Sequence, residues 1–540
     1  MEESDVEVLV VGGGPVGLSM SVELSRHGIS SLLVERHEST SIFPKARLLS
    51  TRTMELVRAW GVQAKVEQAG MPREETLAVG VGSSLTAGDL LHAAAPIEAY
   101  APQSPTFTYL CSQDRFEVIL RDLAEAQPGA DVRFSTTMTG MQTTGEGGVE
   151  AVIETSAGTA RRVRARYLVA ADGARSGIRR DLGIAVEGPP PIGHMVSIMF
   201  DADLRPLLRG RQAALYFLLS DPPGAVEAVD NRHRWMIQTG YDPAEGGSLD
   251  DFTPDYCLRA VRNAVGVPDL PVDVVGTMPW LQQAIVAEEF RRGPVFLAGD
   301  AAHVCTPQGG FGMNLGLQGV HNLAWKLAAV LRGAAGPALL DTYQAERRPI
   351  SDRTAEESLN NSLITFTMME GRLSLQEAIE RQAGRRLAEG LVLGVHYDSP
   401  AVVPDGTPAL ASEDPYRTYV PIARPGHRAP HVWLSGGPHR VSTLDLFGPH
   451  FTLLTPVGSG WVQAAKQSAQ DCGITLEAVE IGVGGSAGRL ASPTWAEEYG
   501  LTATGAVLVR PDGHVGWRQA AGGPSAAVLT SVIETLLART

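Results

Sequence analysis

A glycine-rich turn between a short apolar strand and a helix constrains the fold of this chain most. Val6–Val11 runs into Gly12-Gly13-Gly14-Pro15-Val16-Gly17, which matches G-x-G-x-x-G, and a second strand, Ser31–Val34, ends at Glu35-Arg36. Glu35 lies 18 positions after Gly17, close to the roughly 20 of the dinucleotide fingerprint. Glycines let a pyrophosphate approach the backbone, the helix N-terminus attracts phosphate, and the acid accepts hydrogen bonds from ribose hydroxyls. The segment predicts a βαβ dinucleotide-binding unit but does not separate FAD from NAD; the alternative is a structural βαβ unit.

A second constraint is the stretch from Val295 to Arg332. A buried strand is expected at Val295–Ala298, then the turn Gly299-Asp300, then a loop with glycines at 309, 310 and 312. A long helix is expected from about Met313, and its N-terminus carries roughly half a positive charge. A carboxylate before such a loop suits a cofactor with hydroxyls at one end and negative charge at the other. Reduced flavin meets both requirements.

Three shorter segments supply further candidate cofactor contacts. Pro44-Lys45-Ala46-Arg47 is a basic loop that either meets the pyrophosphate or is solvated. Gln113 opens an amphipathic helix, where it is either a cofactor contact or a helix-start polar residue. Asp172-Gly173 follows another buried strand and precedes clustered arginines. That turn is either a phosphate-facing edge of the nucleotide domain or a plain turn before a charged helix.

Between about 189 and 271 the pattern changes to strands. Trp235, Ile237, Thr239 and Tyr241 alternate with Met236, Gln238 and Gly240, as in a half-buried strand. A sheet inserted here would roof a substrate pocket. Candidate pocket residues are Tyr216, Trp235 and Gln238; the alternative for the aromatic residues is ordinary core.

The C-terminal part begins with a linker that carries seven prolines between Ser399 and Pro430. Strands are expected at 451–455, 475–481, 505–510 and 514–518, with helices at 460–472, 494–499 and 524–537. This order is thioredoxin-like. Cys472 is its only cysteine, so thiol redox chemistry is missing and a structural role or an interface is expected.

Charge and composition exclude several classes. The net charge of −15 disfavours nucleic acid or an anionic membrane as a partner, because both select for basic patches. No apolar run approaches the ~20 residues of a membrane span, and the acidic start predicts no secretory signal. The four cysteines form no C-x-x-C pair and the histidines are scattered. We expect a cytoplasmic protein without a metal site, as monomer or homodimer.

Together these motifs resemble a known family. Gly12-x-Gly14-x-x-Gly17 with Glu35, the Asp172-Gly173 turn, and Gly299-Asp300-Ala301-Ala302-His303 leading to Gly312-Met313-Asn314 are similar to the class A FAD-dependent aromatic hydroxylases of the para-hydroxybenzoate hydroxylase fold. The C-terminal unit is similar to the branch that tailors aromatic polyketides, which includes aklavinone 11-hydroxylase. The likeness covers nearly the whole chain.

The resemblance implies the fold class and its domains. The expected architecture is α/β: a Rossmann-like FAD domain of the para-hydroxybenzoate hydroxylase type, an inserted β-sheet substrate domain, and a C-terminal thioredoxin-like domain. The expected ranges are 1–75, 100–187 and 273–360 for the FAD domain, 76–99 and 188–272 for the substrate domain, 361–430 for a helical region and linker, and 431–540 for the thioredoxin-like domain.

The resemblance also implies site residues. In the family, residues matching Glu35, Arg47, Gln113 and Asp300 contact FAD, and the loop matching Pro307 to Asn314 lies along the isoalloxazine. Phe311 stands where the family often has Gln, so Phe311 and Pro307 are added as pocket candidates. The full cofactor set predicted from motifs and resemblance is Gly12, Gly14, Pro15, Gly17, Glu35, Arg36, Arg47, Gln113, Asp172, Gly173, Asp300, Pro307, Gly310, Gly312, Met313 and Asn314.

The family reaction implied is reduction of FAD by NADPH or NADH, addition of O2 to give a C4a-hydroperoxyflavin, and hydroxylation of an aromatic polyketide. No general base is evident. One alternative is a Baeyer–Villiger or ring-rearranging oxygenase of the same fold. An alternative of another class is a non-catalytic flavoprotein that sequesters an aromatic antibiotic. A halogenase is disfavoured, because the chain has no Trp-x-Trp-x-Ile-Pro stretch.

Overall fold

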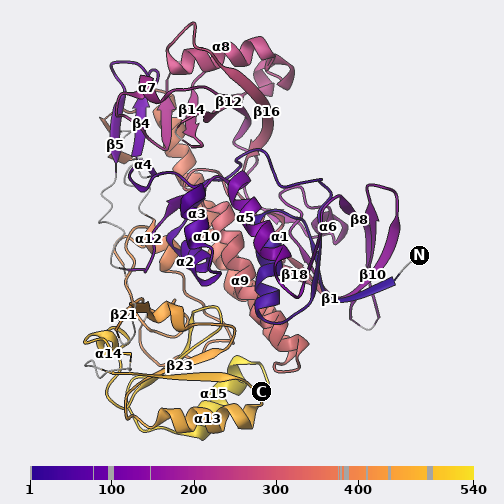
Figure 1. Ribbon diagram of the computed structural model, residues 1–540, viewed down its shortest axis with the longest axis vertical. Helices are drawn as coiled ribbons and strands as arrows, with labels where there is room; N and C mark the ends of the chain where they lie inside the picture. The colour runs from indigo at the N-terminus through magenta and orange to yellow at the C-terminus, as the bar shows by residue number, and fades with distance from the viewer. Residues whose placement is uncertain are drawn as a thin grey trace.

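The protein is described here from a computed structural model of the 540-residue chain. The described residues are 3–76, 78–94, 103–145, 147–219, 221–230, 232–374, 376–377, 380–381, 388–408, 412–435, 440–482 and 490–539. Parts of the predicted segments 76–99, 100–187 and 361–430 lie outside them. The nucleotide-type domain stands in the middle, with the inserted sheet at one end and the C-terminal domain at the other (Figure 1). No described helix combines the length and apolar character that crossing a membrane requires.

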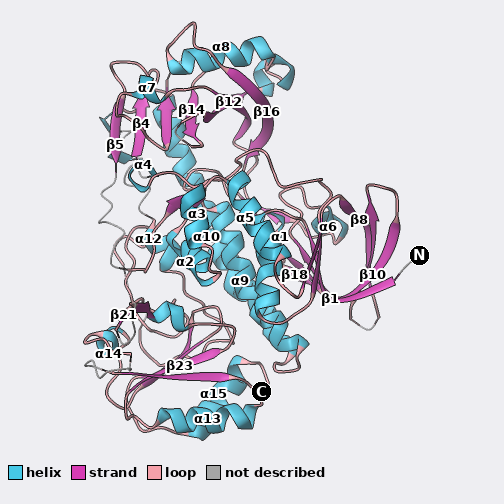
Figure 2. Cartoon of the chain, in the orientation of Figure 1, coloured by secondary structure: helices cyan, strands magenta, loops and turns pink. Residues whose placement is uncertain are grey.

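The central domain is a mixed sheet whose parallel core has the order β19-β10-β1-β2-β7. Its short apolar strands β2 and β19 are buried on both faces, as is usual in parallel sheets. Helices α1, α5 and α9 pack together against it (Figure 2). The strands are β1 Glu3–Val11, β2 Ser31–Val34, β7 Ala130–Arg133, β8 Thr136–Thr143, β9 Val149–Thr155, β10 Ala160–Ala170, β18 Arg291–Arg292 and β19 Val295–Leu297.

The rest of the central domain consists of helices and of short strands that lie outside this sheet. The helices are α1 Pro15–Arg26, α2 Thr51–Ala59, α3 Gln63–Ala69, α4 Arg73–Thr76, α5 Gln113–Glu125, α6 Gly177–Asp181, α9 Gly312–Leu331 and α10 Thr342–Met369. The short strands are β3 Leu48–Leu49, β6 Tyr109–Leu110, β11 Val186–Glu187, β17 Ile285–Ala287 and β20 His303–Val304.

The inserted sheet has the order β16-β12-β15-β14-β13-β4-β5. One face packs on helix α8, Pro254–Val265, whose N-terminus is capped by the Thr253 side chain. The opposite face packs partly on Met368 near the end of α10. The other elements are β4 Ala78–Gly82, β5 Leu91–Ala94, β12 Gly193–Asp201, α7 Arg205–Leu208, β13 Leu215–Leu218, β14 Gly224–Ala228, β15 Arg234–Tyr241 and β16 Asp273–Gln282.

Two predicted domain boundaries separate residues that the structure places in one sheet or one helix. The boundary at residue 272 precedes β16, yet β16 pairs along its length with β12 of the inserted sheet. That strand alternates exposed and half-buried residues, so it lacks the all-apolar character of the central strands. The boundary at residue 360 falls inside α10, which continues to Met369.

The C-terminal domain has the predicted thioredoxin-like order, with sheet order β24-β23-β25-β26. Strands β23 and β24 are parallel, and β25 is antiparallel to β23. Cys472 ends α13 as a free, buried thiol. The elements are α12 Glu389–Leu393, β21 Trp433–Leu434, β22 Val441–Ser442, β23 Phe451–Pro456, α13 Trp461–Cys472, β24 Leu476–Ile481, α14 Trp495–Glu498, β25 Ala506–Val509, β26 Val515–Gln519 and α15 Ala526–Leu536.

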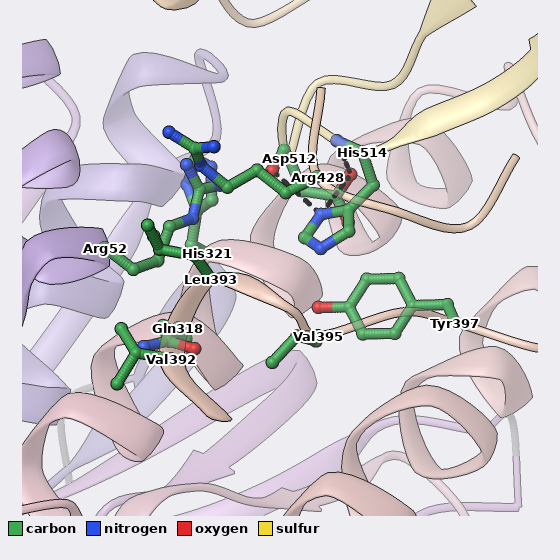
Figure 3. A pocket seen from close by; sticks show the side chains of 10 residues that line it. All are labelled: Arg52, Gln318, His321, Val392, Leu393, Val395, Tyr397, Arg428, Asp512 and His514. Carbon is green, nitrogen blue, oxygen red and sulfur yellow. Dashed lines mark hydrogen bonds and ion pairs between the residues drawn. The ribbon is translucent and has the colours of Figure 1, made fainter. Parts of the chain in front are cut away.

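Buried charges fasten the C-terminal domain to the central one. Lys326 of α9 donates to Glu346 of α10 at 2.7 Å, and Arg510 after β25 pairs with Glu346 at 2.7 Å and with Asp512 at 2.5 Å. All four side chains are at most 1% exposed. Beside them lies a cavity of about 10 Å³, which Figure 3 shows between Arg52, His514 and Tyr397. Such a cavity is about the size of one water molecule.

Candidate active site

The turn after β1 has the geometry that a bound dinucleotide requires. Gly12 has φ +114°, and a Cβ there would lie 2.2 Å from the Ala171 carbonyl oxygen. A Cβ on Gly17 would lie 1.9 Å from the Gly12 carbonyl oxygen, so this glycine lets α1 approach the strand. A Cβ on Gly14 would meet nothing within 4 Å, which leaves open space in front of the helix. Pro15 is buried in the first turn of α1.

Glu35 lies at the end of β2 beside this turn. Its carboxylate accepts the Gly13 N–H at 2.7 Å through Oε2 and the His37 N–H at 2.8 Å through Oε1. The side chain is therefore held at the edge where the predicted ribose would lie. Arg36 is exposed, and its assignment to the cofactor stays a prediction.

The Asp172-Gly173 turn joins the same edge. Gly173 has φ +85°, a conformation that favours glycine. Asp172 Oδ2 accepts the Ile178 N–H at 3.2 Å, while Oδ1 is buried and has no hydrogen-bond partner among the described residues. Arg179 donates to the Ala301 carbonyl at 2.8 Å. The turn is thus tied to the segment that carries Asp300.

Helix α9 begins at Gly312, one residue before the predicted start. Its first N–H groups are free of intrahelical bonds. Its first intrahelical bond runs from the Leu315 N–H to the Phe311 carbonyl at 2.8 Å, so the N–H groups of Gly312, Met313 and Asn314 lack intrahelical acceptors. A Cβ on Gly312 would have Asp300 Oδ1 as its nearest atom, at 4.0 Å. The carboxylate and the positive helix end therefore share one edge of the site.

The side chain of Asn314 is hydrogen-bonded within the protein. Its Oδ1 accepts the Ser50 N–H at 2.8 Å, and its Nδ2 donates to the carbonyls of Leu48 and Gly310 at 2.8 and 2.6 Å. The side chain clamps the glycine loop to β3, and only its backbone is free for a ligand. Met313 is a core residue of the central domain, 9% exposed.

Asp300 is accessible to solvent but surrounded by protein atoms. Desolvation raises its pKa to about 6, against the lowering effect of the Lys45 charge. A carboxylate kept in such a place fits a ligand that supplies hydroxyl donors. Lys45 of the basic loop, rather than Arg47, is the cation whose charge acts on Asp300.

Replacing Asp300 should change how stability depends on pH. Because the pKa is raised in the folded, FAD-free protein, its contribution is favourable at acid pH and is lost as the pH rises through about 6. We expect Asp300→Asn to raise the Tm of the FAD-free protein at neutral pH and to flatten the Tm profile below about pH 6. Thermal melts across that range test this, with Asp122→Asn on the exposed face of α5 as control; an unchanged profile would contradict it.

The side chains of Arg47 and Gln113 are both bonded to other protein residues. Arg47 donates to the carbonyls of Ala214 and Ala228 at 3.0 and 2.6 Å and pairs with Glu227 at 2.8 Å. These partners all belong to the inserted sheet, so Arg47 joins the two domains. Gln113 donates to Glu117 at 2.6 Å. For both residues the FAD contact stays a prediction.

Two of the predicted pocket residues lie on the face of the inserted sheet that packs against α8. Trp235 and Tyr216 are fully buried in the core against α8. Trp235 Nε1 donates to the Ala202 carbonyl at 3.1 Å, and the Tyr216 hydroxyl donates to the Arg211 carbonyl at 2.9 Å. Strand alternation then places Gln238 on the opposite face. Trp235 and Gln238 could not both line one pocket.

Phe311 is a buried residue of the loop before α9, and its assignment to the pocket stays a prediction. Its ring is 5% exposed and packs edge-on against Tyr416, with centroids 6.4 Å apart, in a small apolar cluster with Ala388 and Leu391. It therefore anchors the flavin-type loop to the linker. Pro307 is exposed at the start of that loop, and Gly310 closes it by donating to the Pro307 carbonyl at 3.0 Å.

A polar network that the sequence did not reveal holds this loop from the other side. Gln282 at the end of β16 donates to Gln308 Oε1 at 3.0 Å, and Ser362 of α10 donates to the same oxygen at 2.6 Å. The Ser362 Oγ also lies 2.7 Å from Thr306 Oγ1. The alternation of β16 was the signal that could have identified Gln282, but these contacts join segments far apart in the sequence.

The fold and site define a flavoprotein class: a dinucleotide domain with an acid and a helix N-terminus at one end, covered by an inserted sheet. The FAD binding domain model matches residues 5–358 and the aromatic-ring hydroxylase C-terminal model matches residues 423–540. The chain belongs to the FAD-dependent aromatic-ring hydroxylases, which are monooxygenases, and its cofactor is FAD.

Relatives and solved structures agree with this assignment. The tetracenomycin A2 monooxygenase-dioxygenase of Streptomyces glaucescens is 40% identical, over 100% of this chain and 98% of the relative. An aklavinone 12-hydroxylase of Streptomyces purpurascens is 36% identical over the full length of both. The complex of aklavinone-11 hydroxylase with FAD and aklavinone has a TM-score of 0.88 at 35% identity, and the monooxygenase PieE with FAD and substrate has 0.91 at 31%; each comparison covers both chains fully.

Proposed function

We propose that this enzyme uses NADPH or NADH and O2 to hydroxylate one ring of an aromatic polyketide. The observation that supports it most is the position of the inserted sheet. Its face opposite α8 meets the loop before α9 through Gln282 and Gln308, so a planar substrate there would lie next to the flavin end of the cofactor site.

When bound, FAD supplies the redox chemistry: it takes up electrons from the nicotinamide and activates O2 for transfer of one oxygen atom. The chain supplies binding, orientation and electrostatics. The N–H groups at the start of α9 would stabilise negative charge that develops on the bound ring system. Three features fit the dinucleotide: the open space at Gly14, the Asp172 Oδ1 atom that has no partner among the described residues, and the accessible Asp300 carboxylate.

The inserted sheet limits access of water to the reacting ring. Its face opposite α8 is largely apolar, and the nearby charged side chains Glu227 and Asp201 are paired with Arg47 and Arg234 at 2.8 and 2.9 Å. Exclusion of water protects a reactive oxygen donor from unproductive decay. The polycyclic polyketides in the names of the relatives have the planar, electron-rich rings that such a surface accommodates.

The central experiment is a substrate screen with the purified, FAD-loaded enzyme. Aklavinone, tetracenomycin A2 and related tetracyclic or pentacyclic polyketides are added with NADPH or NADH, and nicotinamide oxidation is followed. We expect at least one of them to stimulate oxidation and to give a product heavier by one oxygen atom, labelled from ¹⁸O2. A yellow protein that shows no stimulated oxidation across the screen would support the non-catalytic alternative.

A second candidate is repeated or ring-opening oxygenation, favoured by the name of the monooxygenase-dioxygenase relative. Incorporation of a second labelled oxygen, or a product with an expanded ring, would identify it. Size-exclusion chromatography of the same preparation tests the expected monomer or homodimer.

A further inference from the structure

We propose that Gln238 fixes the substrate by donating its side-chain amide to a carbonyl oxygen of the ring system, and that Trp280 and Ser197 hold the amide in the orientation this requires. This inference rests on the proposed function and names the chemical group that the pocket recognises. It makes Gln238 a specificity-determining residue for quinone-type carbonyl substrates.

The three residues lie on the face of the inserted sheet that meets the loop before α9, residues 307–311, through Gln282 and Gln308. Ser197 pairs with Gln238 across β12 and β15, and Met195 pairs with Trp280 across β12 and β16. Gln282 lies two residues after Trp280 and therefore on the same face. Trp280 lies about 7 Å along the strand from Gln282, at ~3.4 Å per residue, and Gln282 donates to Gln308 of the loop before α9 at 3.0 Å.

The hydrogen bonds determine which end of the amide is free. Trp280 Nε1 is 3.0 Å from Ser197 Oγ and 3.1 Å from Gln238 Oε1, and Ser197 Oγ donates to Gln238 Oε1 at 2.8 Å. An indole N–H can only donate, so the atom it meets on Gln238 must be the carbonyl oxygen. A flipped amide would place donor against donor.

The amide nitrogen is consequently left to donate elsewhere. In the described part of the chain, Gln238 Nε2 has a contact with Met236 Sδ at 3.8 Å, and a thioether is a weak acceptor. Gln238 is half-buried, while Ser197 is fully buried. The network therefore presents a fixed N–H donor, which selects a ligand that carries an acceptor such as a ring carbonyl.

The surroundings fit a neutral, planar ligand. Residues on this face next to Gln238 include thioether side chains: Met195, Met199, Met236 and Met278, placed by strand register. Methionines are adaptable and make favourable contacts with aromatic rings. No charged side chain contacts the Gln238 amide among the described residues, so the group it binds need not carry a charge.

Binding to the FAD-loaded enzyme without nicotinamide tests the inference. The probes are 1,8-dihydroxyanthraquinone and 1,8-dihydroxyanthracene, which share the tricyclic ring and differ in the ring carbonyls. Titrations follow the perturbation of FAD absorbance. We expect the parent to prefer the quinone by about tenfold, the contribution of one well-made hydrogen bond.

Three variants distinguish the roles. Gln238→Leu should lose the preference while it still binds the anthracene probe. Gln238→Glu keeps an oxygen for Trp280 but faces the ligand with an acceptor, so it should favour the anthracene probe. Trp280→Phe keeps a ring but frees the amide to turn, and should reduce the preference. Gln142→Leu, on the exposed strand β8, is the control and should behave as the parent.

Circular dichroism and FAD content confirm that each variant is folded and loaded. If both Gln238 variants keep the parental preference, the inference is overturned. Failure of the quinone probe to bind the FAD-loaded parent up to its solubility limit overturns it as well. A normal quinone preference without polyketide-stimulated nicotinamide oxidation would instead refute the proposed function and leave the role of Gln238 standing.

Discussion

Substituting Gly14→Val should give a folded protein whose affinity for FAD falls at least about a hundredfold, a loss of roughly 2.7 kcal/mol. Gly14 has extended backbone angles, φ −76° and ψ −175°, which any residue adopts. A Cβ there meets no protein atom within 4 Å, so the FAD-free fold has no reason to be disturbed. The added side chain occupies the space through which a pyrophosphate reaches the helix N-terminus.

Fluorescence titration with FAD measures this loss, and thermal melts of the FAD-free protein check the fold. Gly140→Val, on β8 with equally open space around it, is the matched control and should bind FAD normally. Gly12→Ala should differ from both, because its Cβ would clash with Ala171 and its φ is +114°; this variant should lose stability. If Gly14→Val retained the parental FAD affinity, the dinucleotide would not pass this turn.

The second large effect concerns the buried charges. Glu346→Ala should destabilise the protein by about 3–5 kcal/mol, because it leaves Lys326 and Arg510 buried without their shared carboxylate. Burial by itself would raise the pKa of Glu346, but Arg510 and Lys326 outweigh it and lower the pKa to about 2. The stabilising contribution is therefore present above pH ~4.5 and is lost as the pH falls toward 2.

Urea unfolding followed by tryptophan fluorescence provides the measurement. Glu125→Ala is the comparison, because Glu125 forms an exposed i,i+4 pair with Arg121 on α5 and such pairs contribute at most about 1 kcal/mol. Equal effects of the two substitutions would show that the buried network does not hold the domains together.

Local patterns in the sequence predicted the cofactor domain well, because its chemistry is encoded by neighbouring residues. The turn at Gly12 to Gly17, the strand ending at Glu35 and the start of α9 need only adjacent residues to form, and the structure has each of them within a few residues of the prediction. The thioredoxin-like order followed from the same kind of local periodicity.

The substrate side could not be predicted in the same way. Alternation shows that Trp235 and Gln238 face opposite sides of a strand, but not which side meets the cofactor; that depends on α8 covering one face. Ser197 and Trp280 come from strands more than 80 residues apart in the sequence and become neighbours only through sheet pairing. Arg47 and Asn314 bond to partners more than 160 residues away. Their roles in joining distant segments could therefore not be predicted from neighbouring residues.

Helix α9 has a further consequence for how the molecule behaves. Its first residues lie at the proposed flavin site, and its middle is bound through Asn322 to Asp512 at 3.0 Å and through Lys326 to Glu346. The C-terminal domain thus supports the helix whose N-terminus is proposed to act on the flavin. Weakening the contacts of Asn322 and Lys326 should shift the midpoint potential of the cofactor without any change in the residues around the flavin ring.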